Sequence, residues 1–363
     1  MKRLRILLLF SAGPGNATYS YQVGWPRHFM RHPGFECVPV NVSDRTVSGR
    51  VRAHLTVRRA RADAVVVLHS VFSNACMIGE RLLDAVCRRR LPAAYFIGNE
   101  YKLMPEKMRF CDRLGLTLLV TMVPAARVQG LYRERLGCAV TTLPSAGLDP
   151  EIFRPIRDLD DRGIDIGYRA ADTPLYLGHD ERRRIAEAFL ERAPAAGFYV
   201  DISLSPADRF DQSAWAAFLN RCRTQLGTEA GGDFFELTDE TRTKVNAYER
   251  VHPAATAADV IARFFPPERE RIPVRTISGR HVEAAATKTT QVLFEGRYSG
   301  YFEPDVHYIP LRKDLADLDD VLRKLRDAGY CRKLADNAYE TAIAELTYER
   351  LIDRFRDAFA PLV

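Results

Sequence analysis

Short apolar runs alternate with amphipathic stretches through the first 145 residues. The runs are continuous, which is typical of parallel strands that are buried on both faces. Strands are expected at Ile6–Phe10, Val38–Val42, Ala64–Leu68, Ala93–Ile97, Leu116–Met122 and Val140–Leu143. Helical patterns lie between them, for example at Arg50–Arg61 and Val123–Leu136. This alternation predicts a doubly wound parallel sheet for residues 1–145.

A proline-rich segment interrupts the alternation. Leu143–Pro155 holds three prolines and a glycine in 13 residues, which is typical of a linker. A second series of strands follows at Ile164–Tyr168, Tyr199–Leu204, Arg223–Gly227 and Gln291–Phe294. We therefore predict an α/β protein with two Rossmann-like domains, at residues 1–145 and 146–340.

The end of the chain predicts an amphipathic helix. Its apolar side chains recur at helical spacing, at Tyr348, Leu351, Ile352, Phe355 and Phe359. We expect this helix, within residues 341–363, to pack back on the first domain. A helix on a membrane surface is the alternative, but the polar face carries both signs of charge.

Composition narrows the choice of partners. The 363 residues carry a net charge of +6, with arginines in short runs such as Arg88–Arg90 and Arg182–Arg184. Such runs are typical of solvated helix faces, or of proteins that bind nucleotides or lipid phosphates. The chain has neither the basic–aromatic interleaving of an RNA-binding sheet nor a helix-turn-helix, so nucleic acid is not expected as a partner.

The cysteines and the apolar segments indicate a cellular compartment. Seven cysteines are scattered without a CxxC pair, which argues against a disulfide framework or a structural zinc site and predicts a cytoplasmic protein. The basic start followed by Ile6–Phe10 resembles the start of a signal peptide, but the apolar run is too short. No segment reaches the about 20 apolar residues of a membrane span, so only peripheral contact with a membrane stays open.

Polar residues follow several strands of the first domain, where ligands of open α/β sheets bind. Gly13, Gly15 and Asn16 follow the first strand, although the stretch lacks a third glycine for a dinucleotide fingerprint. His69 follows the third strand and Glu100 the fourth. Histidine titrates near pH 6.5 and suits proton transfer, although a lone histidine is more often structural.

The second domain holds a denser cluster of candidates within Thr276–Lys313. A helix at Arg280–Thr287 carries Glu283, and the strand after it runs directly into Glu295–Gly300. A carboxylate, a guanidinium, a phenol and two glycines thus lie just past the carboxyl end of a strand. A solvated surface turn is the alternative.

Several segments of the second half resemble one enzyme family. The linker SAGLDPEIFRP resembles the G-x-D-x-x-x-F-x-P segment between the domains of retaining glycosyltransferases with the two-domain GT-B fold. VEAAATKTTQVLFEGRYSG is similar to their E-A-x-x-x-G-x-P-V segment, with Lys288 in place of the glycine. The pair IDIGYRA…YLGHDE and RHVEAAA…EPDVHYIPLRKD resembles the spore-maturation-like group, family 1 or 4-like. The resemblance covers about residues 143–315.

This resemblance implies a GT-B fold with the two domains facing a cleft. It implies transfer of a hexose from a nucleotide-diphospho-sugar to an acceptor hydroxyl, with retention and without a metal or other cofactor. The acceptor would be a glycan, a lipid-linked sugar or a small molecule. Other readings of the same fold stay open: a nucleotide-sugar epimerase, a phosphorylase, or a degenerate protein that only binds a nucleotide or a glycan.

The resemblance also implies roles for individual residues. Arg169 would contact the leaving diphosphate, and Glu283 would accept hydrogen bonds from the ribose hydroxyls. His69 or Glu100 would meet the acceptor hydroxyl. The donor side would comprise Glu229, Arg280, His281, Glu283, Lys288, Glu295, Gly296, Arg297, Tyr298, Ser299 and Gly300.

Two positions depart from the family pattern. The usual lysine after Arg169 is missing, and the loop offers His179, Arg182 and Arg183 instead, with Lys288 as a further source of charge. Arg275 stands where many of these enzymes carry a first glutamate, so Glu229 or Glu295 would have to compensate.

Overall fold

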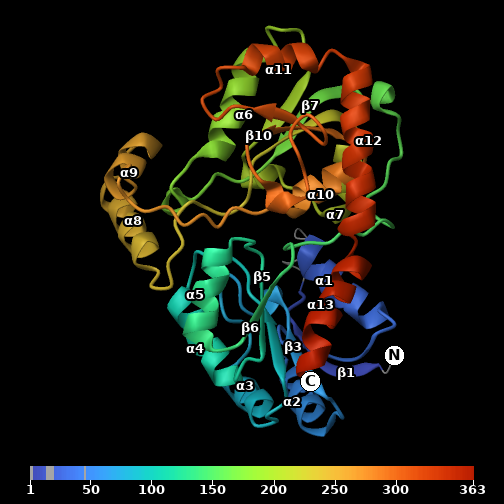
Figure 1. Cartoon of the computed structure of the whole chain (residues 1–363), viewed down its shortest axis with the longest axis vertical. Helices are drawn as coiled ribbons and strands as arrows, with labels where there is room; N and C mark the ends of the chain where they lie inside the picture. The colour runs from blue at the N-terminus through green and yellow to red at the C-terminus, as the bar shows by residue number, and fades with distance from the viewer. Residues whose placement is uncertain (1–2, 14–19, 45) are drawn as a thin grey trace.

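The computed structural model describes residues 3–13, 20–44 and 46–363 of the chain. Its strands form two parallel sheets that lie at opposite ends of the molecule (Figure 1). The predicted α/β architecture with two Rossmann-like halves is therefore confirmed.

The first sheet has six strands in the order β2-β1-β3-β4-β5-β6. The strands are β1 Leu4–Phe10, β2 Phe35–Asn41, β3 Ala64–Val67, β4 Ala93–Phe96, β5 Leu118–Thr121 and β6 Ala139–Thr142. The helices around it are α1 Ser20–Arg31, α2 Val47–Arg59, α3 Glu80–Cys87, α4 Met104–Leu114 and α5 Ala126–Leu136. All six predicted strands exist, and their ends differ from the prediction by at most three residues.

The largest of these differences concerns β2, which was expected only from Val38. It pairs with β1 from Phe35 onward, because the register joins Leu4 to Phe35 and Phe10 to Asn41. Pro39 interrupts the sequence pattern of a strand, but β2 is the edge of the sheet. An edge strand tolerates proline because the missing N–H faces away from the ladder.

The second sheet has five strands in the order β11-β10-β9-β7-β8. The strands are β7 Ile164–Arg169, β8 Val200–Ser203, β9 Cys222–Gly227, β10 Thr290–Phe294 and β11 Ile309–Leu311. The helices that pack on this sheet are α6 Glu181–Arg192, α7 Gln212–Leu219, α10 Gly279–Ala286, α11 Leu318–Lys324 and α12 Ala328–Glu345.

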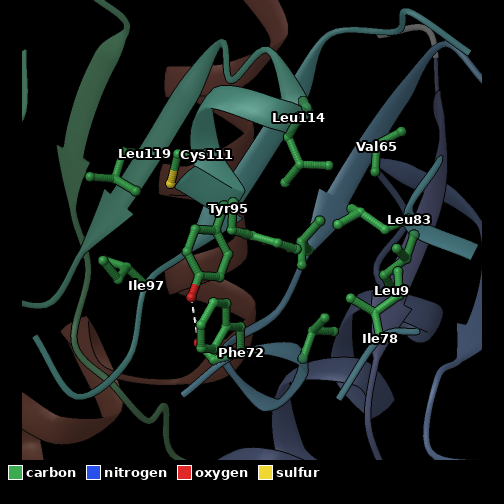
Figure 2. Packing of buried hydrophobic residues seen from close by; sticks show 14 of the residues in the cluster. Leu9, Val65, Phe72, Ile78, Leu83, Tyr95, Ile97, Cys111, Leu114 and Leu119 are labelled. Carbon is green, nitrogen blue, oxygen red and sulfur yellow. Dashed lines mark hydrogen bonds between the residues drawn. The ribbon is translucent and has the colours of Figure 1, made fainter. Parts of the chain in front are cut away.

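Apolar side chains cover both faces of the first sheet, as continuous apolar strands require. On one face, Tyr95 of β4 shares an apolar cluster with Leu9 of β1, Val65 of β3 and Leu119 of β5 (Figure 2). The Tyr95 hydroxyl donates a hydrogen bond to the backbone carbonyl of Phe72, so its polar atom is satisfied inside the core.

A long excursion leaves the second sheet between β9 and α10. It carries α8 (Glu240–Val251) and α9 (Ala257–Phe264), which project to the side of the sheet (Figure 1). The two arms of the excursion meet at a bridge between Phe234 and Ile272. Phe235 belongs to the apolar cluster of the first half, where its ring centroid lies 5.3 Å from that of Tyr132. The excursion therefore joins the two halves.

The last helix, α13 (Tyr348–Phe359), returns to the first half and packs beside α1 (Figure 1). All five side chains of the predicted apolar stripe are buried there. The return of this helix is thus confirmed, while domain boundaries at residues 145 and 340 stay predictions. Among the helices of the described residues, none has both the length and the apolar character needed to span a bilayer.

Candidate functional site

The candidate site is a cavity of about 110 Å³ between the two halves of the molecule. The first half contributes loops at the carboxyl ends of β3, β4 and β5, and the second half contributes the loop after β9 and the start of α6. The lining residues include His69, Gly98–Tyr101, Met122, Arg182, Ala230, Gly231 and Thr276. The cavity is therefore where the sheet rule for α/β proteins places a ligand.

Two arginines converge at the carboxyl end of β7. Arg182, in the first turn of α6, donates from Nη1 to the carbonyl of Ala171 at 3.4 Å. Arg280, in the first turn of α10, donates from Nη1 to the carbonyl of Arg169 at 3.3 Å. In the part of the chain that the structure describes, neither side chain has a carboxylate within salt-bridge distance. The desolvation of Arg280 and the positive charge of Arg182 lower the pKa of Arg280 to about 10.

Two buried polar atoms at this pair have no hydrogen-bond partner among the described residues. The Tyr168 hydroxyl and Arg182 Nε are both buried and form no hydrogen bond within the described residues. Arg280 and Arg182 are close enough to Tyr168 to oppose the rise in its pKa that burial causes. Buried donors normally have partners, so unsatisfied donors beside two cations indicate room for an anion. The first turns of α6 and α10 add their positive helix ends to the same place.

Arg169 has a different environment from the one its predicted role suggests. It ends β7, but its guanidinium turns toward β8, where Nη2 lies 2.6 Å from Asp201 Oδ1. Its guanidinium carbon lies 4.6 Å from the ring centroid of Phe218 and 5.3 Å from that of Phe210. The structure thus brings Arg182 and Arg280 together and holds the Arg169 side chain against Asp201.

Glu283 lies in α10, one turn after the helix start, and is buried. Trp215 donates from its indole N–H to Glu283 Oε2 at 2.8 Å, which fixes the orientation of the carboxylate. His281, one of the predicted donor contacts, instead completes the helix start. Its Nδ1 accepts a hydrogen bond from the Ser278 N–H at 3.1 Å. Burial and the charge of Arg280 lower the pKa of His281 to about 3, so the ring is neutral.

The Glu295–Gly300 loop is pinned by Glu229. The Glu229 carboxylate accepts hydrogen bonds from the backbone N–H groups of Arg297 at 3.2 Å and Tyr298 at 2.8 Å. Gly296 permits this approach, since a Cβ atom there would lie 2.7 Å from the carboxylate. Burial raises the pKa of Glu229 against the opposing effect of these bonds. Glu229 therefore shapes the loop, while the side chains of Glu295 and Arg297 are exposed.

The end of the same loop is fixed to the start of α10. Ser299 adopts a left-handed backbone with φ of 57°, and its hydroxyl accepts a hydrogen bond from the Ile277 N–H at 3.0 Å. Tyr298 is buried and donates its hydroxyl to the carbonyl of Phe294 at 2.6 Å. Gly300 also has a left-handed φ, of 82°. The predicted donor loop thus follows β10 and leads to the same edge of the sheet as the arginine pair.

Lys288 does not belong to this site. It precedes β10, at the opposite end of the strand from the loop, and lines a separate cavity of about 390 Å³. Its ammonium lies 2.7 Å from Asp336 Oδ1. The expectation that Lys288 supplies charge to the donor is wrong, because a residue at the amino end of a strand cannot reach ligands at its carboxyl end.

Arg275, at the position where the resemblance would lead one to expect a first glutamate, is bound inside the second half. It lies 2.8 Å from Glu181 Oε2 and 2.7 Å from Asp233 Oδ1, and all three side chains are largely buried. Burial alone would lower the pKa of Arg275, but these two carboxylates raise it. The residue is a structural ion-pair centre that holds the start of α6 to the arm of the excursion.

The two acceptor-side candidates, His69 and Glu100, both line the cavity, but they differ in their hydrogen bonds and in the direction of their pKa shifts. His69 is buried against the rings of Tyr21, Trp25 and Phe96, and burial lowers its pKa to about 3. The Glu100 carboxylate accepts hydrogen bonds from the hydroxyls of Thr121 at 2.6 Å and Tyr132 at 2.7 Å and from the Met122 N–H at 2.8 Å. Burial raises the pKa of Glu100. Glu100 is therefore engaged in the core, and His69 is neutral.

The glycine-rich loop after β1 is described only in part. Gly13 follows Ala12, whose backbone forms hydrogen bonds with side chains at the end of β2. The Ala12 N–H donates to Asn41 Oδ1 at 3.0 Å. The Ser43 hydroxyl donates to the Ala12 carbonyl at 2.6 Å. Gly15 and Asn16 lie outside the described residues.

Sequence reasoning gave Arg182 only as a substitute for a missing lysine, and it missed Tyr168. One signal in the sequence does point to Arg182: it lies in the first turn of a helix that follows a strand and its loop, where anions bind. Nothing in the sequence signals the Tyr168 hydroxyl, since a tyrosine inside an apolar strand is typical of a core position.

No family model matches this chain. A stretch of 60 residues is 38% identical to uncharacterized protein 035R of Invertebrate iridescent virus 3, and it covers 16% of this chain and 6% of that protein. The match spans too little of either protein to define a relationship.

Solved structures with the same fold cover the whole chain. Sucrose-phosphate synthase from Thermosynechococcus elongatus is 12% identical, covers 99% of each chain and has a TM-score of 0.52. Anabaena HepE in complex with UDP-glucose is 10% identical and covers 99% of this chain and 100% of its own, with a TM-score of 0.51. A glycosyltransferase from Rickettsia africae is 11% identical and covers 100% and 99%, with a TM-score of 0.50. The chain has the fold of GT-B glycosyltransferases.

Proposed function

We propose that this protein is a glycosyltransferase that moves a hexose from a nucleotide-diphospho-sugar to a hydroxyl group of an acceptor. The observation that carries the proposal is the pair of arginines, Arg182 and Arg280, at the carboxyl end of β7. A diphosphate would supply the negative charge that this pair lacks among the described residues, and guanidinium forks match phosphate oxygens.

The same pair supports a mechanism. Negative charge grows on the leaving diphosphate when the bond between the anomeric carbon and the phosphate oxygen breaks. Two guanidinium groups and the Tyr168 hydroxyl, which has no hydrogen-bond partner among the described residues, are oriented before that charge appears. Such orientation is the condition for electrostatic stabilisation of a transition state. Because arginines supply this charge, we propose that the reaction is metal-independent. Retention of the anomeric configuration is proposed from the resemblance of the linker.

The remaining donor contacts follow from position. Glu283 would accept hydrogen bonds from the ribose hydroxyls through the carboxylate that Trp215 orients. Anabaena HepE, a protein of the same fold, was crystallised with UDP-glucose, which supports a nucleotide-sugar as donor. On the acceptor side, the neutral His69 would hold the acceptor hydroxyl by a hydrogen bond, since a ring with a pKa of about 3 is a weak base.

Nucleotide binding tests the proposal directly. We expect one of UDP, GDP or dTDP to raise the melting temperature, because a ligand at 100 times its Kd stabilises a protein by about 2.7 kcal/mol. Arg280→Gln and Arg182→Gln should each weaken that binding about 10- to 100-fold, as expected for loss of a charge-assisted hydrogen bond of about 1.5–3 kcal/mol. Lys288→Gln removes a cation far from the cavity and should leave the affinity unchanged.

The outcome that contradicts the arginine site is equal affinity of the two arginine variants and Lys288→Gln. Product analysis then identifies the reaction. A glycosylated acceptor supports the transferase, and its anomeric configuration reports retention. A new nucleotide-sugar that forms without an acceptor would identify an epimerase, and binding without turnover of any donor would identify a degenerate binding protein.

A further inference from the structure

Helix α2 presents a row of apolar side chains to solvent, far from the arginine pair. Val47, Val51 and Leu55 are 80%, 52% and 42% exposed. They lie four residues apart and so share one face of the helix. The opposite face holds Gly49 and Val57, which are buried against the first half. The exposed row is therefore not the face by which α2 packs.

Arginines flank this row on both sides. The 13 residues of α2 include Arg50, Arg52, Arg58 and Arg59 and no acidic residue. At about 100° per residue, Arg50 falls on one side of the apolar row, Arg52 and Arg59 fall on the other, and Arg58 continues the row itself, three residues after Leu55. Among residues 3–13, 20–44 and 46–363, these four arginines form no salt bridge. The exposed face of α2 thus carries three apolar side chains with arginines on both sides, and His54 and Arg58 lie on the same face.

This face forms one wall of a groove of about 860 Å³ between α2 and residues 76–82. The other wall contributes further apolar side chains, Met77, Ile78 and Leu82. Two carboxylates also line the groove, and both are engaged. Asp44 accepts hydrogen bonds from the backbone N–H and the hydroxyl of Thr46, and Glu80 lies 2.7 Å from Arg113. Asp44 keeps its negative charge, because its partner Thr46 is neutral, whereas Arg113 compensates the charge of Glu80. Arg50, Arg58 and Arg81 also line the groove, so its net charge is positive.

We propose that this face of α2 docks on an anionic phospholipid membrane. A helix with an apolar stripe and basic borders lies in the plane of a membrane interface, with the apolar side chains inserted and the arginines at the phosphates. A nucleic acid would satisfy the arginines but would leave the valines and the leucine against water or phosphate, so the apolar stripe favours lipid. The inference concerns a surface separate from the donor site and does not depend on the proposed reaction.

Vesicle sedimentation with the full chain tests this docking. We expect binding to phosphatidylcholine vesicles that contain 30% phosphatidylglycerol at near-physiological salt, and no binding to pure phosphatidylcholine. The double variant Arg50→Gln/Arg58→Gln should weaken binding about 25-fold, since each basic residue near the surface contributes about fivefold. The double variant Val51→Ser/Leu55→Ser keeps every charge and should also weaken binding at least tenfold. Val251→Ser, at a valine that is 68% exposed on α8, is the matched control.

A fluorescent reporter separates insertion from simple charge attraction. Leu55→Trp should show a blue-shifted indole emission on anionic vesicles, whereas Val251→Trp should show none. The proposal is overturned if neither wild type nor Leu55→Trp responds to anionic vesicles. It is equally overturned if the serine variants bind as tightly as wild type and a DNA duplex competes for the same arginines, because the surface would then bind polyanions rather than membrane.

Discussion

Arg275 differs from the glutamate that the resemblance leads one to expect, and it has a structural role beside the cavity. The position resembles one where retaining GT-B glycosyltransferases carry a glutamate, yet here the guanidinium binds Glu181 and Asp233 inside the protein. Lys313 also reaches Glu181, at 2.9 Å. The network joins the start of α6, the arm of the excursion and the segment before α10. Its role is to hold these three elements together beside the cavity.

We predict that Arg275→Gln destabilises the whole protein. The substitution leaves two carboxylates buried without their shared cation, and breaking a buried pair in this way lowers the free energy of unfolding by about 3–5 kcal/mol. Chemical denaturation measures the loss. Arg312→Gln is the control, because both Arg312 and Asp314 are exposed and such a pair contributes less than about 1 kcal/mol. Similar stabilities of the two variants would contradict the assigned network.

Helix α13 depends on close approach to two glycines. A Cβ atom on Gly24, inside α1, would lie 2.3 Å from ring atoms of Tyr348, and one on Gly147, in the linker, would lie 2.7 Å from the same ring. The Tyr348 N–H also donates to the carbonyl of Leu148 at 3.1 Å. The first turn of α13 is thus clamped between α1 and the linker, which explains how a helix at the chain end is held on the first half.

We predict that Gly24→Ala destabilises the wild-type protein but stabilises a Tyr348→Ala variant. In the wild-type background the new methyl group collides with the Tyr348 ring, and the free energy of unfolding should fall by about 1–3 kcal/mol. In a Tyr348→Ala background the collision is absent, and the same change should stabilise α1 by about 0.5–1 kcal/mol through helix propensity. Denaturant titration of the four proteins gives both values.

A helical glycine without neighbours provides the control for this cycle. Gly130 lies in α5, and a Cβ atom there meets nothing within 4 Å. Gly130→Ala should therefore stabilise the protein by about 0.5–1 kcal/mol in either background. If Gly24→Ala behaves like Gly130→Ala in the wild type, the clamp is not present in solution.

Elements with a strong periodic pattern were predictable, and those defined by tertiary contact were not. The strands of the first sheet follow from continuous apolar runs, and α13 follows from its stripe. The arms around α8 and α9 carry no such pattern, because Phe235 and Val274 lie among charged residues and proline and not in a continuous apolar run. They become core residues only because the first half lies next to them. The sequence around Phe235 and Val274 contains no information on their packing against the first half.

At the scale of the molecule, the sheet rule predicted the end of the sheets where the cavity lies, but not which side chains line it. The residues that follow strands do lie near one cleft, since the carboxyl ends of both sheets face it. Which side chain points into the cleft depends on its neighbours. Arg169 follows its strand as expected, but Asp201 on the adjacent strand captures the guanidinium. Strand adjacency is a property of topology, so the sequence alone could not separate Arg169 from Arg280.

Three of the buried histidines have strongly lowered pKa values, which makes the whole fold sensitive to acid. Burial lowers the pKa of His69 to about 3, of His281 to about 3 and of His179 to about 4, from an ordinary value of 6.5. Below pH 6.5 the unfolded chain binds protons that the folded chain excludes. The stability that these neutral rings contribute is therefore complete above pH 6.5 and is lost as pH falls toward 4.

We predict that acidification from pH 7 to pH 5 lowers the free energy of unfolding by about 2 kcal/mol for each of these histidines. One unit of pKa difference corresponds to about 1.4 kcal/mol. His69→Phe replaces one of them with a ring that suits its aromatic surroundings and cannot be protonated. Its unfolding free energy should fall by about 2 kcal/mol less than that of wild type over the same pH range, as measured by urea denaturation at each pH. Leu190→Ala, at an exposed position that does not titrate, should keep the wild-type dependence. A pH dependence of His69→Phe identical to wild type would show that His69 is charged or exposed in the folded protein.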